Sequence, residues 1–293
     1  MDFRQLKYFY EVAKQNNITK ASQTLHISQP ALSKMIKGLE EELGMPLILR
    51  SNKVSELTDA GKVVYEYAQR IISQVNEMHT TLNDMTHLAR GEINIGVPPI
   101  VGSLYFPKVM ANFHRLYPNI EINITEYGAA RVVKSVEEGE FEMGVAVLPV
   151  NEEVFNIHPI VYDELKLLVH PEHRFAERDT VHLKELNGED FIFYSEEFAL
   201  YEIMRKKFIQ QGFEPKILFK SSQWDFMSEM VAANLGISIL PDSICRRTDQ
   251  KNIKIIKLIP VSPWNLALIT KKEKYISIAG RTFIDFMVAS MTL

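Results

Sequence analysis

Residues 19–44 read TKASQTLHISQPALSKMIKGLEEELG, and this stretch decides the fold of the N-terminal part of the chain. Thr19 suits the N-cap position of a short helix over residues 20–25, because its hydroxyl can accept a hydrogen bond from a free backbone N–H. His26 and Ile27 then make a tight turn before the next apolar-periodic segment. Two helices joined by a turn of three or four residues are typical of a helix-turn-helix unit.

The second helix of this unit begins after Ser28, which we expect to cap it. It carries Pro30 in its first turn, where a missing N–H does no harm, and Gly44 ends it. The small side chains of Ala21 and Ala31 predict that the two helices pack closely.

The exposed face of the second helix is rich in hydrogen-bond donors. Gln29 can make two hydrogen bonds with adenine in a DNA major groove, and Lys34 and Lys37 can reach guanine or a phosphate. Thr19 and Ser28 lie where the N–H groups of helix N-termini point at phosphates. We therefore predict a DNA-binding face that comprises Thr19, Ser28, Gln29, Pro30, Ser33, Lys34 and Lys37. The alternative is a small helical hairpin that merely packs against its neighbours.

Two further elements flank this unit. Residues 3–15 carry apolar side chains at three- and four-residue spacing, which predicts an amphipathic helix. Residues 47–57 contain two apolar, β-prone stretches around a polar turn. We predict a short hairpin there, a wing that lies along the DNA backbone with Arg50 and Lys53 in contact with phosphates.

The distribution of charge is compatible with a nucleic-acid partner, although the whole chain is acidic. The formal net charge is −4, from 33 Lys and Arg against 37 Asp and Glu. Residues 1–53 nevertheless contain eight Lys and Arg and only five Asp and Glu. A local basic surface on an acidic protein is typical of specific DNA binders, and an ordinary solvated face is the alternative.

The run from Phe3 to Gly61 resembles the DNA-binding domain of LysR-type transcriptional regulators. The matching residues are Leu6, Phe9, Ala13, Thr19, Ala21, Ser22, Leu25, Ser28 to Ser33, Ile36, Leu39, Glu40, Leu43, Gly44, Leu47, Arg50, Leu57, Thr58, Ala60 and Gly61. The resemblance implies a winged helix-turn-helix domain, which we place at residues 1–58. It also implies a sequence-specific homodimer or homotetramer on promoter DNA, with RNA polymerase as a further partner, and it favours an activator.

A long helix should follow, because Thr58 is a suitable N-cap and no breaker occurs before Gly91. Its apolar residues alternate at steps of four and three, which is a heptad seam. They are Val64, Ala68, Ile71, Val75, Met78, Leu82, Met85 and Ala89. At about 1.5 Å per residue, residues 59–90 would span about 48 Å, so a monomer would leave this seam in water. We predict a linker helix that pairs with its copy in a second chain; packing against its own domain is the alternative.

From Glu92 onward, strands alternate with helices. Strands are predicted at residues 93–97, 120–127, 141–148, 165–170, 191–194, 216–220, 237–240, 253–259 and 266–270. Helices are predicted at residues 103–117, 132–138, 199–211 and 225–234. This alternation is typical of an α/β fold with parallel sheets that helices cover on both faces.

Ligands of such folds bind at the carboxyl ends of strands, beside helix N-termini. The segments 98–103 and 219–224 each leave a strand and enter a helix, and the turn at Ser195 is a third candidate. A small anion fits such places without a buried cation. The predicted effector-binding residues are Ile100, Gly102, Ser103, Ser195, Ser222 and Gln223. The alternative is ordinary helix capping by these serines.

The LysR resemblance continues in this region and implies a two-lobed effector domain like that of periplasmic binding proteins. The matching segments are residues 106–118, 141–146 and 236–241, with Glu126 and Gly139. We place this domain at residues 91–293, with lobe I at 91–161 and 267–293 and lobe II at 162–266. The segment 98–103 is similar to a CidR-like subgroup, which implies a small carboxylate effector, an organic acid anion.

Length and composition limit the other possibilities. A chain of 293 residues that is 46% hydrophobic and 24% charged is typical of a globular protein with about two domains. No apolar run approaches the ~20 residues of a membrane span, and the N-terminus lacks a signal peptide, so we expect a cytoplasmic location without a membrane partner. The single cysteine, Cys245, excludes an internal disulfide; beside Arg246 and Arg247 it is either redox-sensitive or passive.

The sequence lacks the common catalytic signatures. Neither a glycine-rich phosphate loop nor a Gly-x-Ser-x-Gly elbow occurs, and we interpret His170 and His173 as parts of a polar turn rather than metal ligands. We predict no enzymatic activity, no cofactor and no metal. Two other classes stay open: a solute-binding protein of a transporter, and an enzyme that uses the α/β cleft.

Overall fold

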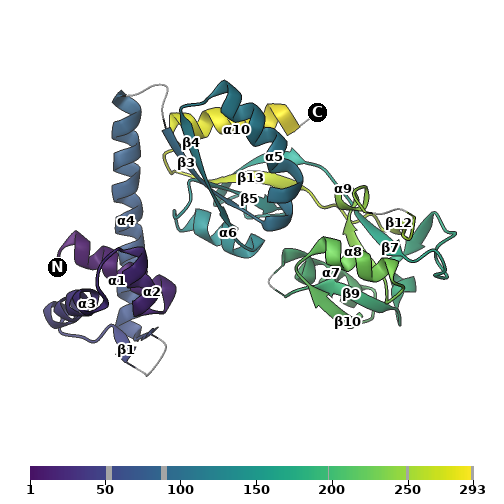
Figure 1. Ribbon diagram of the computed structural model, residues 1–293, viewed down its shortest axis with the longest axis horizontal. Coiled ribbons are helices and arrows are strands. Elements are labelled where there is room, and N and C mark those ends of the chain that lie inside the picture. Colours follow the sequence, from purple (N-terminus) through teal and green to yellow (C-terminus); the bar gives the residue numbers. More distant parts are fainter. Residues whose placement is uncertain (51–54, 87–90, 197, 249–250, 292–293) are drawn as a thin grey trace. The chain divides into compact units, whose positions relative to one another are not determined.

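The computed structural model describes residues 1–50, 55–86, 91–196, 198–248 and 251–291 (Figure 1). The chain forms two compact units. The first comprises residues 1–82 with 138–140, and the second comprises residues 83–137 with 141–293. Within the described ranges, no helix combines the length and the apolar composition that crossing a bilayer requires.

The first unit starts with three helices around one apolar core. They are α1 (Phe3–Gln15), α2 (Ile18–Thr24) and α3 (Gln29–Leu43). Phe9 and Val12 of α1, Ala21 of α2 and Leu32 of α3 are fully buried in this core. Ile27, in the turn between α2 and α3, packs against the same cluster. The predicted amphipathic first helix and the helix-turn-helix are therefore confirmed.

In the helix-turn-helix, the predicted helix ends at Ser28 and Gly44 are confirmed. The Ser28 hydroxyl accepts a hydrogen bond from Ala31 N at 3.4 Å, and Gly44 ends α3 in the left-handed conformation with φ of 69°. The prediction that Thr19 caps α2 is wrong. Asn17 is the cap, because its Oδ1 accepts from the backbone N–H groups of Thr19 and Lys20, each at 3.0 Å. Thr19 therefore lies in the first turn of α2.

The expected role of Ala31 in packing is also wrong. Ala31 is exposed, and Leu32 faces the core instead. The helix period explains the error: adjacent residues differ by about 100° in direction, so a one-position shift moves a side chain off the buried face.

The wing is confirmed as an antiparallel hairpin. Strand β1 (Ile48–Arg50) pairs with β2 (Ser55–Leu57), and Ile48 lies opposite Leu57. The backbone of Arg50 ends β1, but its side chain lies outside the described residues, as does all of Lys53. Their phosphate contacts stay predictions.

Helix α4 (Asp59–Thr86) follows, and the Thr58 hydroxyl caps it by accepting a hydrogen bond from Gly61 N at 2.9 Å. The prediction extended this helix to residue 90, and residues 87–90 lie outside the described part of the chain. The first turns of α4 belong to the core of the first unit, because Val64 packs against the helix-turn-helix cluster.

Lobe I of the second unit contains a five-stranded sheet in the order β4-β3-β5-β13-β6. The strands are β3 (Gly91–Val97), β4 (Ile120–Glu126), β5 (Met143–Val147), β6 (Phe155–Val161) and β13 (Leu266–Lys271). Helices α5 (Pro99–Leu116) and α10 (Ile278–Met291) lie together on one side of this sheet, and α6 (Ala129–Glu137) lies on the other (Figure 1). Phe113 of α5 packs edge-on against Phe283 of α10, with ring centroids 5.0 Å apart.

Lobe II is built around a four-stranded sheet in the order β11-β7-β12-β8 and a two-stranded sheet, β10-β9. A bridge between Phe191 and Ile237 connects these two sheets. The strands are β7 (Leu165–Val169), β8 (Thr180–His182), β9 (Asp190–Tyr194), β10 (Lys216–Ser221), β11 (Ser238–Pro241) and β12 (Lys254–Ile259). The helices are α7 (Ala199–Gln210), α8 (Trp224–Ala232), the short α9 (Asp242–Cys245) and a 3₁₀ turn (Leu183–Leu186).

The predicted α/β fold is confirmed, but the prediction of parallel sheets holds only for some of the strand pairs. Strands β3, β4 and β5 are parallel, but β13 runs antiparallel to both of its neighbours, β5 and β6. In lobe II, β7 is antiparallel to β11 and β12. The reason in lobe I is the path of the chain: β13 returns from lobe II and enters the first sheet from the opposite end.

Two elements of lobe I have no counterpart in the predictions from sequence, namely β6 and α10. Strand β6 carries Pro159 and His158 and has no clean alternation. It is an edge strand, where a missing N–H is tolerated, and its register with β13 shifts next to Pro159. Helix α10 is apolar on most of its circumference, so its period is difficult to distinguish from that of a buried strand.

Candidate functional site

The predicted DNA-binding residues of α3 gather on one side of the helix. Successive residues turn by about 100°, so Gln29, Ser33 and Lys37 align along the helix, with Pro30 and Lys34 beside them. All five are exposed except Ser33, which is half-buried. The opposite side carries Leu32, Ile36 and Leu39, which fill the core.

The polar groups of this surface are only partly used by the protein itself. Ser28 uses its hydroxyl for the helix cap, and Lys37 lies 3.4 Å from the Glu41 carboxylate in an exposed ion pair. An exposed pair of this kind is weak and can exchange for a phosphate. The first turn of α3 contains no acidic residue, so its N–H groups and Gln29 face no repulsive charge of the helix itself when they approach DNA. Thr19 is also exposed, on α2.

The predicted dimerisation seam of α4 divides into two parts. Ala68 is fully buried and Val64 is half-buried in the first unit, so the alternative of packing against the chain's own domain holds for these two residues. Farther along, Ile71 is 37% exposed, and Met78 and Leu82 are each 51% exposed. Val75 is half-buried, and the Met85 side chain lies outside the described residues.

Two exposed apolar residues of α4, Val63 and Tyr67, were not predicted as part of the seam. Val63 is 55% exposed and Tyr67 is 59% exposed. They precede Ile71 at intervals of four residues, so they continue the exposed part of the seam toward the start of α4. A strict alternation of four and three excludes them, but a helix period of 3.6 allows a wider stripe, and this signal was available in the sequence.

The effector candidates of lobe I occupy the first turns of a helix that begins earlier than predicted. Helix α5 starts at Pro99, not at Ser103, because proline suits the first helical position. Gly102 N donates to Pro98 O at 3.0 Å, and the Ser103 hydroxyl donates to Ile100 O at 3.2 Å. The Ser103 side chain remains exposed, but its backbone N–H is inside the helix rather than at its N-terminus.

The space beside Gly102 is partly filled by a side chain of the protein itself. A Cβ atom at this position would lie 3.2 Å from Glu126 Oε1 at the end of β4. The carboxylate of Glu126 therefore disfavours an anion directly at Gly102.

The effector candidates of lobe II form a cluster at the ends of two parallel strands. Ser195 N donates to Ser221 O at 3.0 Å, which ties the end of β9 to the end of β10. Gln223 N donates to the Ser221 hydroxyl at 3.0 Å, whereas Ser222 is exposed. The structure thus brings Ser195 next to residues 221–223. Among the described residues, no direct hydrogen bond joins this cluster to Ser103.

Sequence reasoning missed the cation of this cluster. Lys220 Nζ lies 2.5 Å from Glu196 Oε1 and 5.3 Å from the centre of the Tyr201 ring. The hydrogen bond to Glu196 raises the pKa of Lys220, and the same contact lowers the pKa of Glu196. The signal was a lysine near the end of β10, directly before the two serines. Lys220 is a group that an organic anion could engage in place of Glu196.

A cavity of about 550 Å³ lies where the two lobes approach each other. Lobe I contributes Ala129 and Val133 of α6 and residues 147–151, and lobe II contributes Ala199 and Ile203 of α7. The walls are mostly apolar. None of the six predicted effector residues lines this cavity, although α7 begins only four residues after Ser195.

The structure shows what surrounds Cys245 and His173. Cys245 is fully buried, and burial raises the pKa of its thiol. The neighbouring arginines do not stabilise a thiolate, because Arg246 pairs with Asp242 and Arg247 donates to Leu104 O at 2.9 Å. This supports the passive interpretation of Cys245. His173 Nε2 lies 3.1 Å from Glu189 Oε2, in agreement with a polar turn.

Family models match both parts of the chain. The model for the bacterial regulatory helix-turn-helix protein, lysR family, matches residues 3–62. The model for the LysR substrate binding domain matches residues 86–292. The winged helix-turn-helix and the two-lobed α/β domain are therefore the two modules that these models describe.

Relatives of similar length extend this match over the whole chain. The HTH-type transcriptional regulator YwbI of Bacillus subtilis is 46% identical over 286 residues, which cover 97% of this chain and 95% of the relative. A full-length OxyR variant from Pseudomonas aeruginosa has a similar fold, with a TM-score of 0.73 at 22% identity over 100% of this chain and 95% of its own. Full-length CbnR in complex with its target DNA has a TM-score of 0.55 at 24% identity, over 99% and 100% of the two chains.

The matched families are those of transcriptional regulators. This chain therefore belongs to the LysR family of DNA-binding transcriptional regulators.

Proposed function

We propose that this regulator binds promoter DNA as a two-fold dimer, within a tetramer, and that α3 of each chain enters a major groove. The observation that carries the proposal is the division of α3 into a buried apolar side and an exposed side with Gln29, Lys34 and Lys37. Gln29 and Ser33 would contact base edges, while Thr19, Ser28, Pro30 and the two lysines would contact the DNA backbone or position the helix. CbnR, a regulator with a similar fold, was solved with its target DNA.

The exposed part of the α4 seam supports the dimer. Ile71, Met78 and Leu82 form an apolar stripe that water would cover in a single chain. Pairing of two α4 helices through this stripe, with Val75 and Met85, buries it and places two copies of α3 about one turn of DNA apart, roughly 34–36 Å. We assign residues 1–58 to DNA binding, 59–90 to dimerisation and 91–293 to effector binding.

The effector domain would convert ligand binding into a change of DNA geometry. We propose that a small carboxylate binds between the lobes near Ser103, Ser195, Ser222 and Gln223, with Lys220 as its cation. Ile100 and Gly102 would form the apolar side of the site, and the anion would lie toward lobe II, away from Glu126. A ligand that prefers one arrangement of the lobes shifts the assembly toward that arrangement, and the bend of the DNA with it. We propose activation of transcription in the cytoplasm, with RNA polymerase as the partner, as the outcome.

A gel-shift assay tests the DNA-binding part of this proposal. The duplex is the DNA upstream of the encoding operon, and the control is a shuffled duplex of equal length and composition. We expect specific affinity at least about 1000-fold above that for the shuffled duplex, together with protection of two half-sites in a footprint. Equal affinity for both duplexes would contradict the proposal.

A further inference from the structure

A hydrogen bond from Arg247 to the backbone of Leu104 joins the two lobes of the second unit. Arg247, which follows α9 in lobe II, donates from Nη2 to Leu104 O at 2.9 Å. Leu104 lies in the second turn of α5 in lobe I, 143 positions earlier in the sequence. This contact depends on how the lobes are arranged, whereas a hydrogen bond within one lobe does not.

The position of Pro107 explains why a carbonyl group inside a helix is open to this arginine. Pro107 lies within α5 and has no N–H, so Ser103 O loses its donor within the helix. A proline inside a helix also disturbs the preceding turn, which contains Leu104. Because a carbonyl oxygen has two lone pairs, Leu104 O can accept a hydrogen bond from outside the helix.

The two neighbouring arginines of lobe II have different partners. Arg246 donates from Nε to Asp242 Oδ2 at 2.8 Å, and Asp242 lies four residues earlier, on α9. The contact of Arg246 therefore stays within lobe II. Arg247 has the same charge one position later, but its guanidinium reaches lobe I. A comparison of these two arginines separates the loss of a charge from the loss of a contact between the lobes.

The contact of Arg247 lies beside the segments that cross between the lobes. Asp163, in the first crossing, accepts a hydrogen bond from Ser243 N at its Oδ2 atom, at 3.1 Å, and one from Trp264 N at its backbone oxygen, at 2.7 Å. Tyr105 of α5 faces this cluster: burial raises the pKa of its hydroxyl, and the charge of Asp163 raises the pKa further, while that of Arg247 opposes the rise. Lobe I, the crossing and lobe II therefore meet at one polar cluster.

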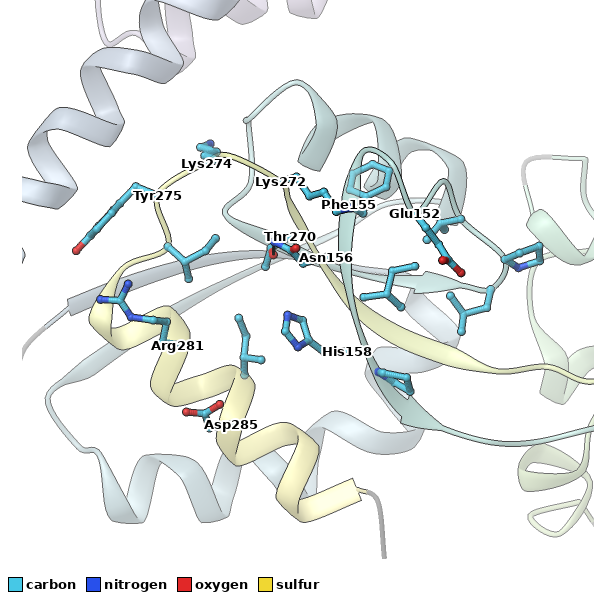
Figure 2. A pocket seen from close by; sticks show the side chains of 17 residues that line it. Glu152, Phe155, Asn156, His158, Thr270, Lys272, Lys274, Tyr275, Arg281 and Asp285 are labelled. Carbon is cyan, nitrogen blue, oxygen red and sulfur yellow. Dashed lines mark hydrogen bonds between the residues drawn. The ribbon is translucent and has the colours of Figure 1, made fainter.

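Open space lies away from this cluster, along the edge strand β6 of lobe I. A cavity of about 1070 Å³ follows β6 and shares residues 148–150 and Phe155 with the cavity between the lobes. Figure 2 shows it beside α10, with Phe155 and His158 of β6 on its wall. Neither Leu104 nor Arg247 lines either cavity. The lobes can therefore change their arrangement on this side without disruption of a close-packed core.

We propose that the hydrogen bond from Arg247 to Leu104 O is a latch that holds the two lobes in this arrangement, and that its release lets lobe II move about the crossings. A single hydrogen bond suits a switch, because a ligand can interchange two arrangements only when their free energies differ little. Ser103 directly precedes Leu104, so a ligand at Ser103 would act on the latch through the first turns of α5. This consequence rests on the proposed function, whereas the latch itself does not.

Pulsed double electron–electron resonance on the full chain, without DNA or ligand, tests the latch. Spin labels at Lys272→Cys in lobe I and Lys206→Cys in lobe II, both exposed positions, report the distance between the lobes. Cys245 is fully buried and stays unlabelled. Labelled chains are diluted with unlabelled chains, so that only distances within one chain contribute. We expect Arg247→Ala to raise the population of a second distance at least about fivefold.

Arg246→Ala is the matched control, because it removes the same charge one position away without the loss of a contact to lobe I. It should leave the distance between the lobes unchanged. A second pair of labels at Lys206→Cys and Lys254→Cys, both exposed and both in lobe II, should give the same distance in all three proteins and so shows that lobe II keeps its fold.

Three results would overturn the proposal: an unchanged distance between the lobes in Arg247→Ala, an equal change in Arg246→Ala, or a change of the distance within lobe II in Arg247→Ala. Because neither ligand nor DNA is present, each of these results leaves the proposed effector site and the proposed DNA contacts untouched.

Discussion

Helices α3 and α5 both carry a proline in their first two positions, but the polar side chains near their N-termini have different partners. On α3, Gln29 and Lys34 project from the fold and serve no internal contact that the structure describes. On α5, the Ser103 hydroxyl donates back to its own helix. The side chains proposed to contact bases lie on one helix, whereas the proposed effector site between the lobes depends on groups from more than one segment. We therefore expect the two regions to respond differently to mutation.

Charges in the proposed dimer seam of α4 should cause the largest loss of operator affinity. Met78→Glu/Leu82→Glu places charges on the exposed stripe of α4, where a paired helix would bury them without partners. We expect a monomer in analytical ultracentrifugation and a loss of operator affinity of about 100-fold or more, because the second half-site no longer adds to binding.

Asn76→Glu/Thr80→Glu is the control for that variant. Asn76 and Thr80 lie on the opposite side of α4, where Asn76 is exposed and Thr80 is half-buried, so a long Glu side chain at either position can reach water. The control should remain dimeric with unchanged affinity. A dimeric Met78→Glu/Leu82→Glu chain would show that α4 does not form the interface.

The effector region should lose its response without any loss of DNA binding. Ser103→Ala/Ser222→Ala removes two exposed hydroxyl groups that contribute nothing to the cores of the lobes. In a thermal-shift measurement with carboxylates of two to six carbons, the unchanged chain should gain several degrees with one of them, and the variant should gain none. Operator affinity without ligand should agree between the two proteins. An equal thermal shift in the variant would place the effector elsewhere.

The wing should contribute a smaller and sequence-independent part of the affinity. Arg50→Ala removes one proposed phosphate contact, so binding to every duplex should weaken by a similar factor. The slope of log affinity against log salt concentration should become flatter by about one ion. The measurement is a salt titration on operator and shuffled DNA, and an unchanged slope would remove Arg50 from the phosphate contacts.

The smallest effect should be a dependence of stability on pH that arises from His158 of β6. Burial lowers the pKa of His158 in the folded chain, so the unfolded chain takes up this proton more readily as pH falls through about 6.5. The stability that the neutral ring retains at pH 7.5 is therefore lost progressively toward pH 5.5. Urea unfolding at both values should show a smaller loss for His158→Gln than for the unchanged chain. Equal losses in the two proteins would contradict this effect.

Local signals explain why the N-terminal unit was predictable from sequence. The cap at Ser28, the stop at Gly44 and the apolar stripe of α3 each depend on residues within one helix. Even there, the cap predicted at Thr19 is at Asn17 instead, because the Asn17 side chain accepts hydrogen bonds from two N–H groups. The face of α3 could be assigned from sequence; its DNA contacts remain proposals.

The effector domain depends on contacts between distant segments, and these could not be predicted in the same way. The direction of β13 follows from its return from lobe II, which no pattern within residues 266–271 records. Strand β6 was missed because Pro159 and His158 interrupt its alternation. The ion pair between Lys220 and Glu196 connects residues that are 24 positions apart in the sequence. The role of Lys220 as the cation of that cluster could therefore not be predicted from either segment alone.

The central claim is that the exposed side of α3 discriminates between DNA sequences, and Gln29→Ala tests it most directly. The measurement is the ratio of operator affinity to shuffled-DNA affinity, at one salt concentration, for the unchanged chain and the variant. We predict a fall in operator affinity that corresponds to about 1–3 kcal/mol, with shuffled-DNA affinity unchanged. An equal loss on both duplexes, or no loss on either, would contradict the claim.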